Sequence, residues 1–88
     1  MITKITKMVP VNYYVIDGEE FNANDLFCTL DTIVEGDPYE LDYALYEIAQ
    51  KLYDMGYLQR RFIYHEDVVY YDTEDKKAKA LFEEILKM

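Results

Sequence analysis

The sequence predicts a small α+β domain, and three observations carry this prediction. Segments rich in β-branched and aromatic residues, typical of strands, lie near the start of the chain and again in its second half. Segments with apolar residues every three or four positions, typical of helices, lie between and after them. No linker or repeat interrupts the series. We expect three helices and a mostly antiparallel sheet of three or four strands, in the order β(β)ααββα. With 88 residues, 51% of them hydrophobic, the span 1–88 is expected to form a single domain with one modest core.

The N-terminal strands are indicated by composition and by a turn signal. Residues 11–16 are mostly β-branched or aromatic, and Asp17-Gly18 suits the positive φ angles of a tight hairpin turn. The segment from Glu19 to Phe21 is then expected to pair back. Residues 2–8 are a candidate for a further strand, although their isoleucines are three positions apart rather than two.

Two helices are expected in the middle of the chain. Asn22 or Asn24 is predicted to cap a first helix over residues 23–35, which Gly36 would end. The second helix is predicted to begin at Asp37-Pro38 and to end at Gly56. Apolar residues follow a helical spacing in both, at Leu26, Phe27, Leu30, Ile33 and Val34 in the first, and at Leu41, Ala44, Leu45, Ile48, Leu52 and Met55 in the second.

The C-terminal part reads as a hairpin followed by a helix. Residues 60–64 and 68–71 are the expected strands, with His65-Glu66-Asp67 at the bend. Thr73 is predicted to cap the last helix. Its apolar face would consist of Ala78, Leu81, Phe82, Ile85 and Leu86.

Acidic residues are concentrated in one part of the chain. Between Met8 and Gln50 there is no lysine or arginine, yet this stretch holds ten carboxylates, and the whole chain has a net charge of −9. Such a surface repels nucleic-acid backbones and anionic membranes, so we expect neither as a direct partner. A block of one charge sign instead favours a protein partner with a basic surface. We expect these carboxylates to gather on one solvent-facing side of the folded molecule.

Tyrosines and carboxylates share the outer face of the expected second helix, opposite its apolar stripe. Residues three and four apart are neighbours on a helix, so these side chains are expected to form one exposed ridge. Tyrosine is enriched in binding hot spots because it offers a large contact area at low entropy cost. The candidate partner-binding residues are Asp37, Tyr39, Glu40, Asp42, Tyr43, Tyr46, Glu47 and Asp54. An ordinary solvated helix face would show the same pattern, and the sequence leaves both interpretations open.

The sequence contains no recognisable catalytic or metal-binding pattern. It has no serine, and a nucleophilic Cys28 would have His65 as its only histidine base. His65-Glu66-Asp67 reads as a polar turn, because three adjacent residues at a tight bend point in different directions. We therefore expect no catalytic residue, no metal and no cofactor, and a protein that is not an enzyme. A lone cysteine and an N-terminal segment without the apolar stretch of a signal peptide predict a cytoplasmic location.

In its size, its acidic block and its many tyrosines, the chain resembles the small acidic inhibitors that bacteriophages encode, such as anti-CRISPR proteins, anti-restriction proteins and uracil-DNA glycosylase inhibitors. The resemblance implies a non-enzymatic inhibitor, acting in a bacterial host, whose acidic surface mimics nucleic acid and occupies the basic groove of a host enzyme. The alternative is a small interaction adaptor or regulator without mimicry. A homodimer formed through Tyr13, Tyr14, Tyr70 and Tyr71 is one version of that alternative.

Overall fold

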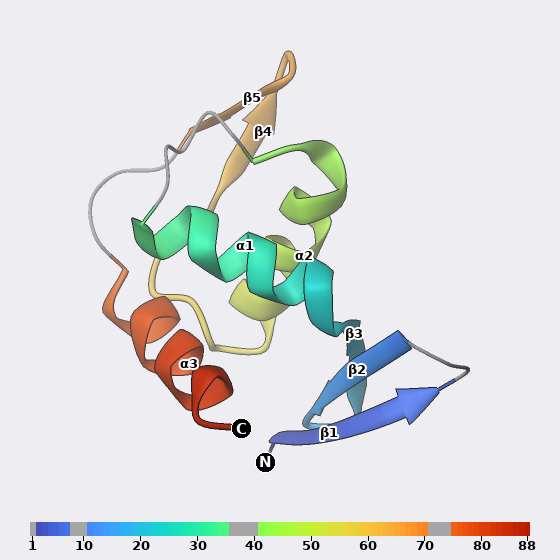
Figure 1. Ribbon diagram of the computed structural model, residues 1–88. Helices are drawn as coiled ribbons and strands as arrows, with labels where there is room; N and C mark the ends of the chain where they lie inside the picture. The colour runs from blue at the N-terminus through green and yellow to red at the C-terminus, as the bar shows by residue number, and fades with distance from the viewer. Residues whose placement is uncertain (1, 8–10, 36–40, 71–74) are drawn as a thin grey trace.

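The fold is taken from a computed structural model and is described for residues 2–7, 11–35, 41–70 and 75–88. The elements are β1 (Ile2–Lys7), β2 (Val11–Ile16), β3 (Glu19–Asn22), α1 (Ala23–Glu35), α2 (Tyr43–Asp54), β4 (Ile63–His65), β5 (Val68–Tyr70) and α3 (Lys76–Leu86). The prediction of an α+β fold is confirmed. The strands form two separate antiparallel sheets, β1-β2-β3 and β4-β5. Figure 1 shows these sheets at opposite ends of the molecule, with α1 and α2 between them and α3 to one side.

The first sheet is a meander whose register places apolar side chains on the side of the helices. β1 pairs with β2 along its whole length, from Ile2 opposite Ile16 to Lys7 opposite Val11. β2 then turns into β3 through Asp17 and Gly18, whose φ angles are 50° and 88°, as the expected turn requires. Tyr14, its cross-strand partner Phe21, and Ile16 are all buried.

Helix α1 has the predicted bounds of residues 23–35 because its start signal and its apolar spacing are both local. The side chain of Asn22 caps it, since its Oδ1 accepts hydrogen bonds from the backbone N–H groups of Asn24 and Asp25 at 3.0 and 3.1 Å. Leu26 and Leu30 are fully buried. Phe27, predicted on the same apolar face, is instead 40% exposed, and its ring contacts that of Phe82 in α3 with centroids 5.3 Å apart.

Helix α2 begins at Tyr43, later than predicted. Its N-cap is Asp42, whose Oδ1 accepts a hydrogen bond from the N–H of Leu45 at 2.9 Å. The predicted start at residues 37–38 lies outside the described residues. The predicted end is confirmed, because Gly56 has φ 88° and the N–H of Tyr57 donates to the carbonyl of Leu52 at 2.9 Å, which closes the helix in a Schellman motif.

The first strand of the second hairpin is shorter than predicted, and the hairpin forms its own sheet. Its turn consists of Glu66 and Asp67, with φ angles of 51° and 62°, and the phenol of Tyr64 donates to Asp67 at 2.7 Å. Ile63 lies opposite Tyr70, so these two side chains share the outer face, while Val69 is fully buried on the inner one.

Helix α3 is capped by Asp75, not by the predicted Thr73, which lies outside the described residues. Asp75 is only 3% exposed, and its carboxylate accepts a hydrogen bond from the N–H of Ala78 in its own helix. The same carboxylate accepts from the N–H of Gln59 at 2.9 Å and of Arg60 at 3.0 Å, in the loop that follows α2. One buried side chain therefore starts α3 and ties it to that loop.

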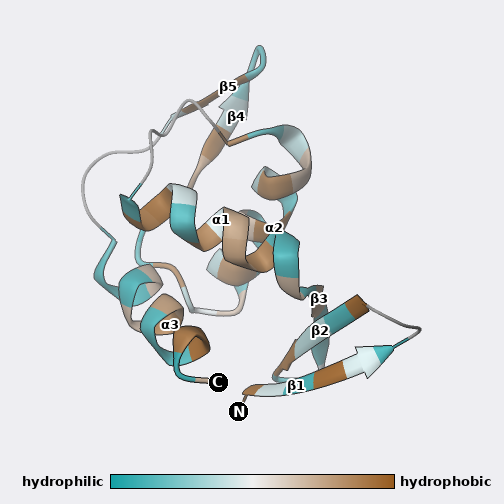
Figure 2. Ribbon diagram, in the orientation of Figure 1, coloured by the Kyte–Doolittle hydropathy of each residue, from teal (hydrophilic) through white to brown (hydrophobic). Residues whose placement is uncertain are grey.

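The core lies between the three helices and the inner sides of the two sheets. Hydrophobic and hydrophilic residues alternate along each helix, as Figure 2 shows. The largest fully buried side chains come from every part of the fold, and include Ile16, Leu26, Leu30, Leu52, Phe62 and Leu81. In α3 the predicted apolar face is buried except for Leu86, which is 59% exposed. Among the described residues no helix has the length and apolar character needed to cross a bilayer.

Candidate partner-binding groove

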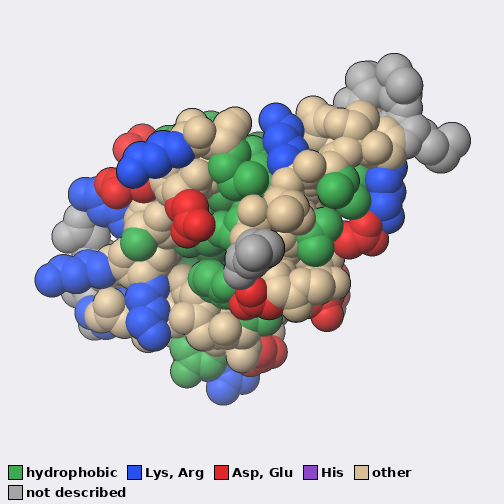
Figure 3. Space-filling model, turned by 90° about the horizontal axis from the view of Figure 1, so that it is seen from below, with side chains coloured by type: hydrophobic (Ala, Val, Ile, Leu, Met, Phe, Trp, Pro, Cys, Tyr) green, Lys and Arg blue, Asp and Glu red, His purple; other side chains and the backbone are tan. Residues whose placement is uncertain are grey.

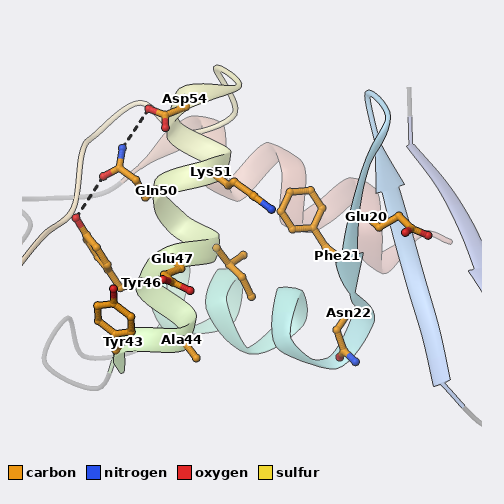
Figure 4. Close-up of a pocket in the computed structure, with 11 residues that line it drawn as sticks. Glu20, Phe21, Asn22, Tyr43, Ala44, Tyr46, Glu47, Gln50, Lys51 and Asp54 are labelled. Atoms are coloured by element: carbon orange, nitrogen blue, oxygen red, sulfur yellow. Dashed lines mark hydrogen bonds between the residues drawn. The ribbon is translucent and has the colours of Figure 1, made fainter.

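An open groove of about 580 Å³ runs between β3 and α2 (Figure 4). The α2 wall presents the face that is opposite the buried Ala49 and Leu52. The β3 wall is a segment that sequence reasoning did not connect with the site, because its pairing with α2 depends on the tertiary fold. The lining residues are Glu20, Phe21, Asn22, Tyr43, Ala44, Tyr46, Glu47, Ile48, Gln50, Lys51 and Asp54.

Three tyrosines form a cluster at the start of α2. The ring centroid of Tyr64 in β4 lies 5.3 Å from that of Tyr43 and 5.4 Å from that of Tyr46, with the Tyr43 ring nearly perpendicular to it. Tyr43 remains 56% exposed, which leaves much of its surface available to a partner. Aromatic pairs in such tilted arrangements stabilise each other by about 0.5–1.5 kcal/mol beyond area burial. The cluster is therefore a preorganised aromatic surface at one end of the groove.

Polar side chains continue this surface along α2 in steps of one helical turn. The phenol of Tyr46 donates to Gln50 Oε1 at 3.3 Å, and Gln50 Nε2 donates to Asp54 Oδ1 at 3.1 Å (Figure 4). This chain of hydrogen bonds holds the three side chains in defined conformations. Glu47, which lines the middle of the groove, makes no ion pair or hydrogen bond through its carboxylate with any described residue.

The two walls differ in how their negative charges are balanced. On β3, Glu20 pairs with Lys7 at 2.6 Å and Glu19 pairs with Lys51 at 3.6 Å. On α2, neither Glu47 nor Asp54 forms an ion pair within the described part of the chain. The unbalanced negative charge of the groove thus lies on the α2 wall.

Lys51 extends across the groove from α2 toward β3 (Figure 4). Its Nζ lies 5.9 Å from the ring centroid of Phe21 as well as near Glu19. Lys7 makes an analogous combination beside the groove, with its Nζ 5.0 Å from the ring of Tyr13 and its ion pair to Glu20. Cations placed between an aromatic ring and a carboxylate are therefore a repeated element of this region.

Two phenols near the site have altered acidity. The pKa of Tyr64 is raised by its hydrogen bond to Asp67, by partial loss of solvation, and by the negative charges of Asp67 and Asp42. The pKa of Tyr57 is raised by its hydrogen bond to Asp17, at 2.6 Å, and by partial loss of solvation. Both groups therefore stay protonated at neutral pH and act as hydrogen-bond donors. The Tyr57–Asp17 bond joins the β2–β3 turn to the loop after α2.

The structure brings together only part of the predicted site. Of the eight candidates, those that line the groove are Tyr43, Tyr46, Glu47 and Asp54. Asp42 is exposed at the start of α2, where its side chain caps the helix. The other three lie outside the described residues, namely Asp37, Tyr39 and Glu40.

The acidic residues do not all converge on one side. Asp31 and Glu35 are exposed on α1, Asp17 lies at the β2–β3 turn, and two carboxylates of β3 are paired with lysines. Figure 3 shows acidic and basic side chains interspersed on the face that it views.

The tyrosines considered for a homodimer do not share a face. Tyr13 and Tyr14 are adjacent in β2 and so point to opposite sides of the first sheet, and Tyr14 is only 8% exposed. Tyr70 belongs to the other sheet, at the far end of the molecule, and Tyr71 lies outside the described residues. The prediction of one face formed by these residues is therefore wrong.

The described residues contain no group of three or more histidine, cysteine or carboxylate side chains placed to hold a metal ion. Cys28 is a partly exposed free thiol on α1, and His65 is on β4 with its Nε2 3.8 Å from Glu66.

No protein-family model matches the chain, and no curated protein or solved structure is significantly similar to it. What the groove binds is therefore inferred from its own side chains.

Proposed function

We propose that the protein is a non-enzymatic inhibitor that uses its acidic, tyrosine-rich α2 surface as a nucleic-acid mimic. Its partner is a host enzyme with a basic nucleic-acid-binding groove, such as a CRISPR effector, a restriction enzyme or a repair enzyme, in the cytoplasm of a bacterium. The observation that carries the proposal is the α2 wall of the groove. There Glu47 and Asp54, without ion pairs among the described residues, follow Tyr43 and Tyr46 along one side of the helix.

The physical argument compares this wall with a nucleic-acid strand. Both present negative charges next to flat aromatic surfaces on which basic side chains can stack. Carboxylates without internal counter-ions gain more from an external lysine or arginine than paired ones do, because no internal pair has to be broken. The exposed ring of Tyr43 supplies an apolar contact that water would leave on docking.

The proposal is tested by competition for nucleic acid. The protein is added to a panel of Cas effectors, restriction enzymes and repair glycosylases bound to labelled DNA, and release of the DNA is followed by fluorescence anisotropy. We expect release at about 0.1 M salt. Direct binding of the protein to the DNA-free enzyme should weaken strongly between about 0.1 M and about 1 M salt, since the Debye length falls from about 10 Å to about 3 Å.

A double variant, Glu47→Gln with Asp54→Asn, should release less DNA. The charge-matched control Asp31→Asn with Glu83→Gln, on the exposed faces of α1 and α3, should behave like the native protein. If the protein released DNA from none of the panel enzymes at low salt, this result would contradict the proposal.

One observation favours the second candidate, an adaptor or a homodimer without mimicry. The cross-strand pair Ile63 and Tyr70 on the outer face of the second hairpin is 57% and 50% exposed, an apolar surface with no described neighbour covering it. Sedimentation that shows a dimer at both low and high salt, lost in Ile63→Lys, would support this candidate over the first.

A further inference from the structure

We infer that the β3–α2 groove binds an extended segment of the partner that carries arginine side chains, and that Lys51 is a resident cation which this segment displaces. The inference rests on the proposed function, because it specifies the chemistry of the basic partner surface. It is carried by the groove, by its unpaired carboxylates and by the position of Lys51.

The length of the groove indicates how much chain it takes. Its α2 wall runs from Tyr43 to Asp54, which at about 1.5 Å per residue is roughly 16 Å. An extended segment rises about 3.3 Å per residue, so about five residues span this distance. Glu47 and Asp54 are two helical turns apart, roughly 10 Å. Two basic residues placed three apart match that separation and point to the same side when the extended segment is in the polyproline II conformation, which rises about 3.1 Å per residue with three residues per turn.

Lys51 shows the kind of group that the groove accepts. It lies between Glu47 and Asp54 along the helix, and its ammonium group already rests near the ring of Phe21 and the carboxylate of Glu19. Its pair with Glu19 is long, at 3.6 Å, and exposed on both sides, so little is lost when another cation replaces it. The groove thus contains a cation that belongs to the protein itself, the ammonium group of Lys51, which is held weakly by an aromatic ring and a carboxylate.

Arginine fits the α2 wall better than lysine does. The planar guanidinium stacks on a tyrosine ring and donates to a carboxylate at the same time, whereas an ammonium group is a compact and strongly hydrated charge. The exposed ring of Tyr43 and the unpaired carboxylate of Glu47 are one helical turn apart, which places a ring and an acceptor beside the same incoming side chain.

The test uses a fluorescein-labelled peptide, Gly-Arg-Gly-Gly-Arg-Gly, and its lysine counterpart, with binding measured by anisotropy at low salt. We expect the arginine peptide to bind more tightly than the lysine peptide. Glu47→Gln should weaken binding roughly fivefold, and Lys51→Met, which keeps the apolar stem, should strengthen it by a similar factor. The matched controls on α3, Glu83→Gln and Lys79→Met, should each change affinity less than twofold. Circular dichroism of each variant confirms that it is folded.

Three outcomes would overturn the inference. Equal losses in Glu47→Gln and Glu83→Gln would mean that the peptide senses only the overall charge. No gain in Lys51→Met would mean that Lys51 does not occupy the binding position. No peptide binding, with DNA release from a panel enzyme intact, would mean that the groove does not take an extended arginine segment, and would leave inhibition through the α2 surface standing. Peptide binding without any release from the panel would support the inference and contradict the proposed function.

Discussion

Asp75 offers the sharpest test of how the fold is held together. Its buried carboxylate accepts hydrogen bonds from the backbone of Ala78 at the start of α3 and from the backbone of Gln59 and Arg60, some fifteen residues earlier in the chain. Asp75→Ala removes the helix cap, which costs about 1 kcal/mol. It also takes a charged acceptor from two loop amides, at about 1.5 kcal/mol each or more. The expected loss in the free energy of unfolding is therefore about 4 kcal/mol.

That loss is large for a chain of this size, whose total stability is expected to be roughly 4–13 kcal/mol. Asp75→Asn keeps the shape and one oxygen acceptor, so it should lose about half as much. The assay is urea unfolding followed by far-ultraviolet circular dichroism, in which Asp75→Ala should lower the midpoint by about 2 M with an unchanged slope.

Asp31→Asn, at an exposed position of α1, is the control and should stay within about 0.5 kcal/mol of the native protein. A loss of less than about 1 kcal/mol in Asp75→Ala would refute the view that this carboxylate joins α3 to the loop.

Three further predictions concern the turns, the phenols and the core. Gly18→Ala should lower stability by about 1 kcal/mol in urea unfolding, because φ is 88° there. Apart from its chain neighbours, no described residue has an atom within 4 Å of an added Cβ, so only backbone strain is introduced, and an unchanged midpoint would contradict this. The pKa of Tyr57 is raised, so its hydrogen bond contributes fully to stability below about pH 10, the unfolded value, and this contribution is lost as pH rises through the folded-state pKa. The melting temperature of Tyr57→Phe should therefore decrease less at alkaline pH than that of the native protein. Equal decreases would argue against the bond to Asp17. Phe62→Ala, at a side chain that is 1% exposed, should cost about 3–5 kcal/mol in the same urea assay, and a cost near zero would mean that Phe62 is not in the core.

The sequence predicted those elements whose signals are local. Helix α1 has the predicted bounds because its cap, Asn22, and its apolar spacing lie within the segment itself. The turn at Asp17-Gly18 and the helix end at Gly56 were predicted for the same reason, since positive φ at these positions favours glycine or aspartate.

The misplaced helix starts have a common physical cause. The chain offers several residues that can cap a helix, and a local pattern does not rank Asp37 against Asp42, or Thr73 against Asp75. The choice of Asp75 depends on the amides of Gln59 and Arg60, which only the folded chain brings to it. The separation of the strands into two sheets depends in the same way on contacts distant in sequence.

Only one of the two walls of the candidate groove could be predicted from the sequence. Helical spacing identified the α2 wall, because Tyr43, Tyr46, Glu47 and Asp54 repeat at intervals of three, four and seven residues. The β3 wall and the balancing of its carboxylates by Lys7 and Lys51 follow from tertiary structure. The excess of negative charge in the sequence therefore overstated how much of it is free to meet a partner.

At the tip of the second hairpin, a negatively charged residue occupies a strained backbone conformation. Glu66 and Asp67 both hold left-handed backbone angles, which aspartate tolerates but which cost a glutamate roughly 1 kcal/mol. Glu66→Asn would relieve part of that strain, leave the Tyr64–Asp67 bond in place and remove one negative charge. A more stable form of the protein is thus within reach of one substitution at a residue that does not line the groove, and such a form would give crystallography and binding assays a more stable starting material.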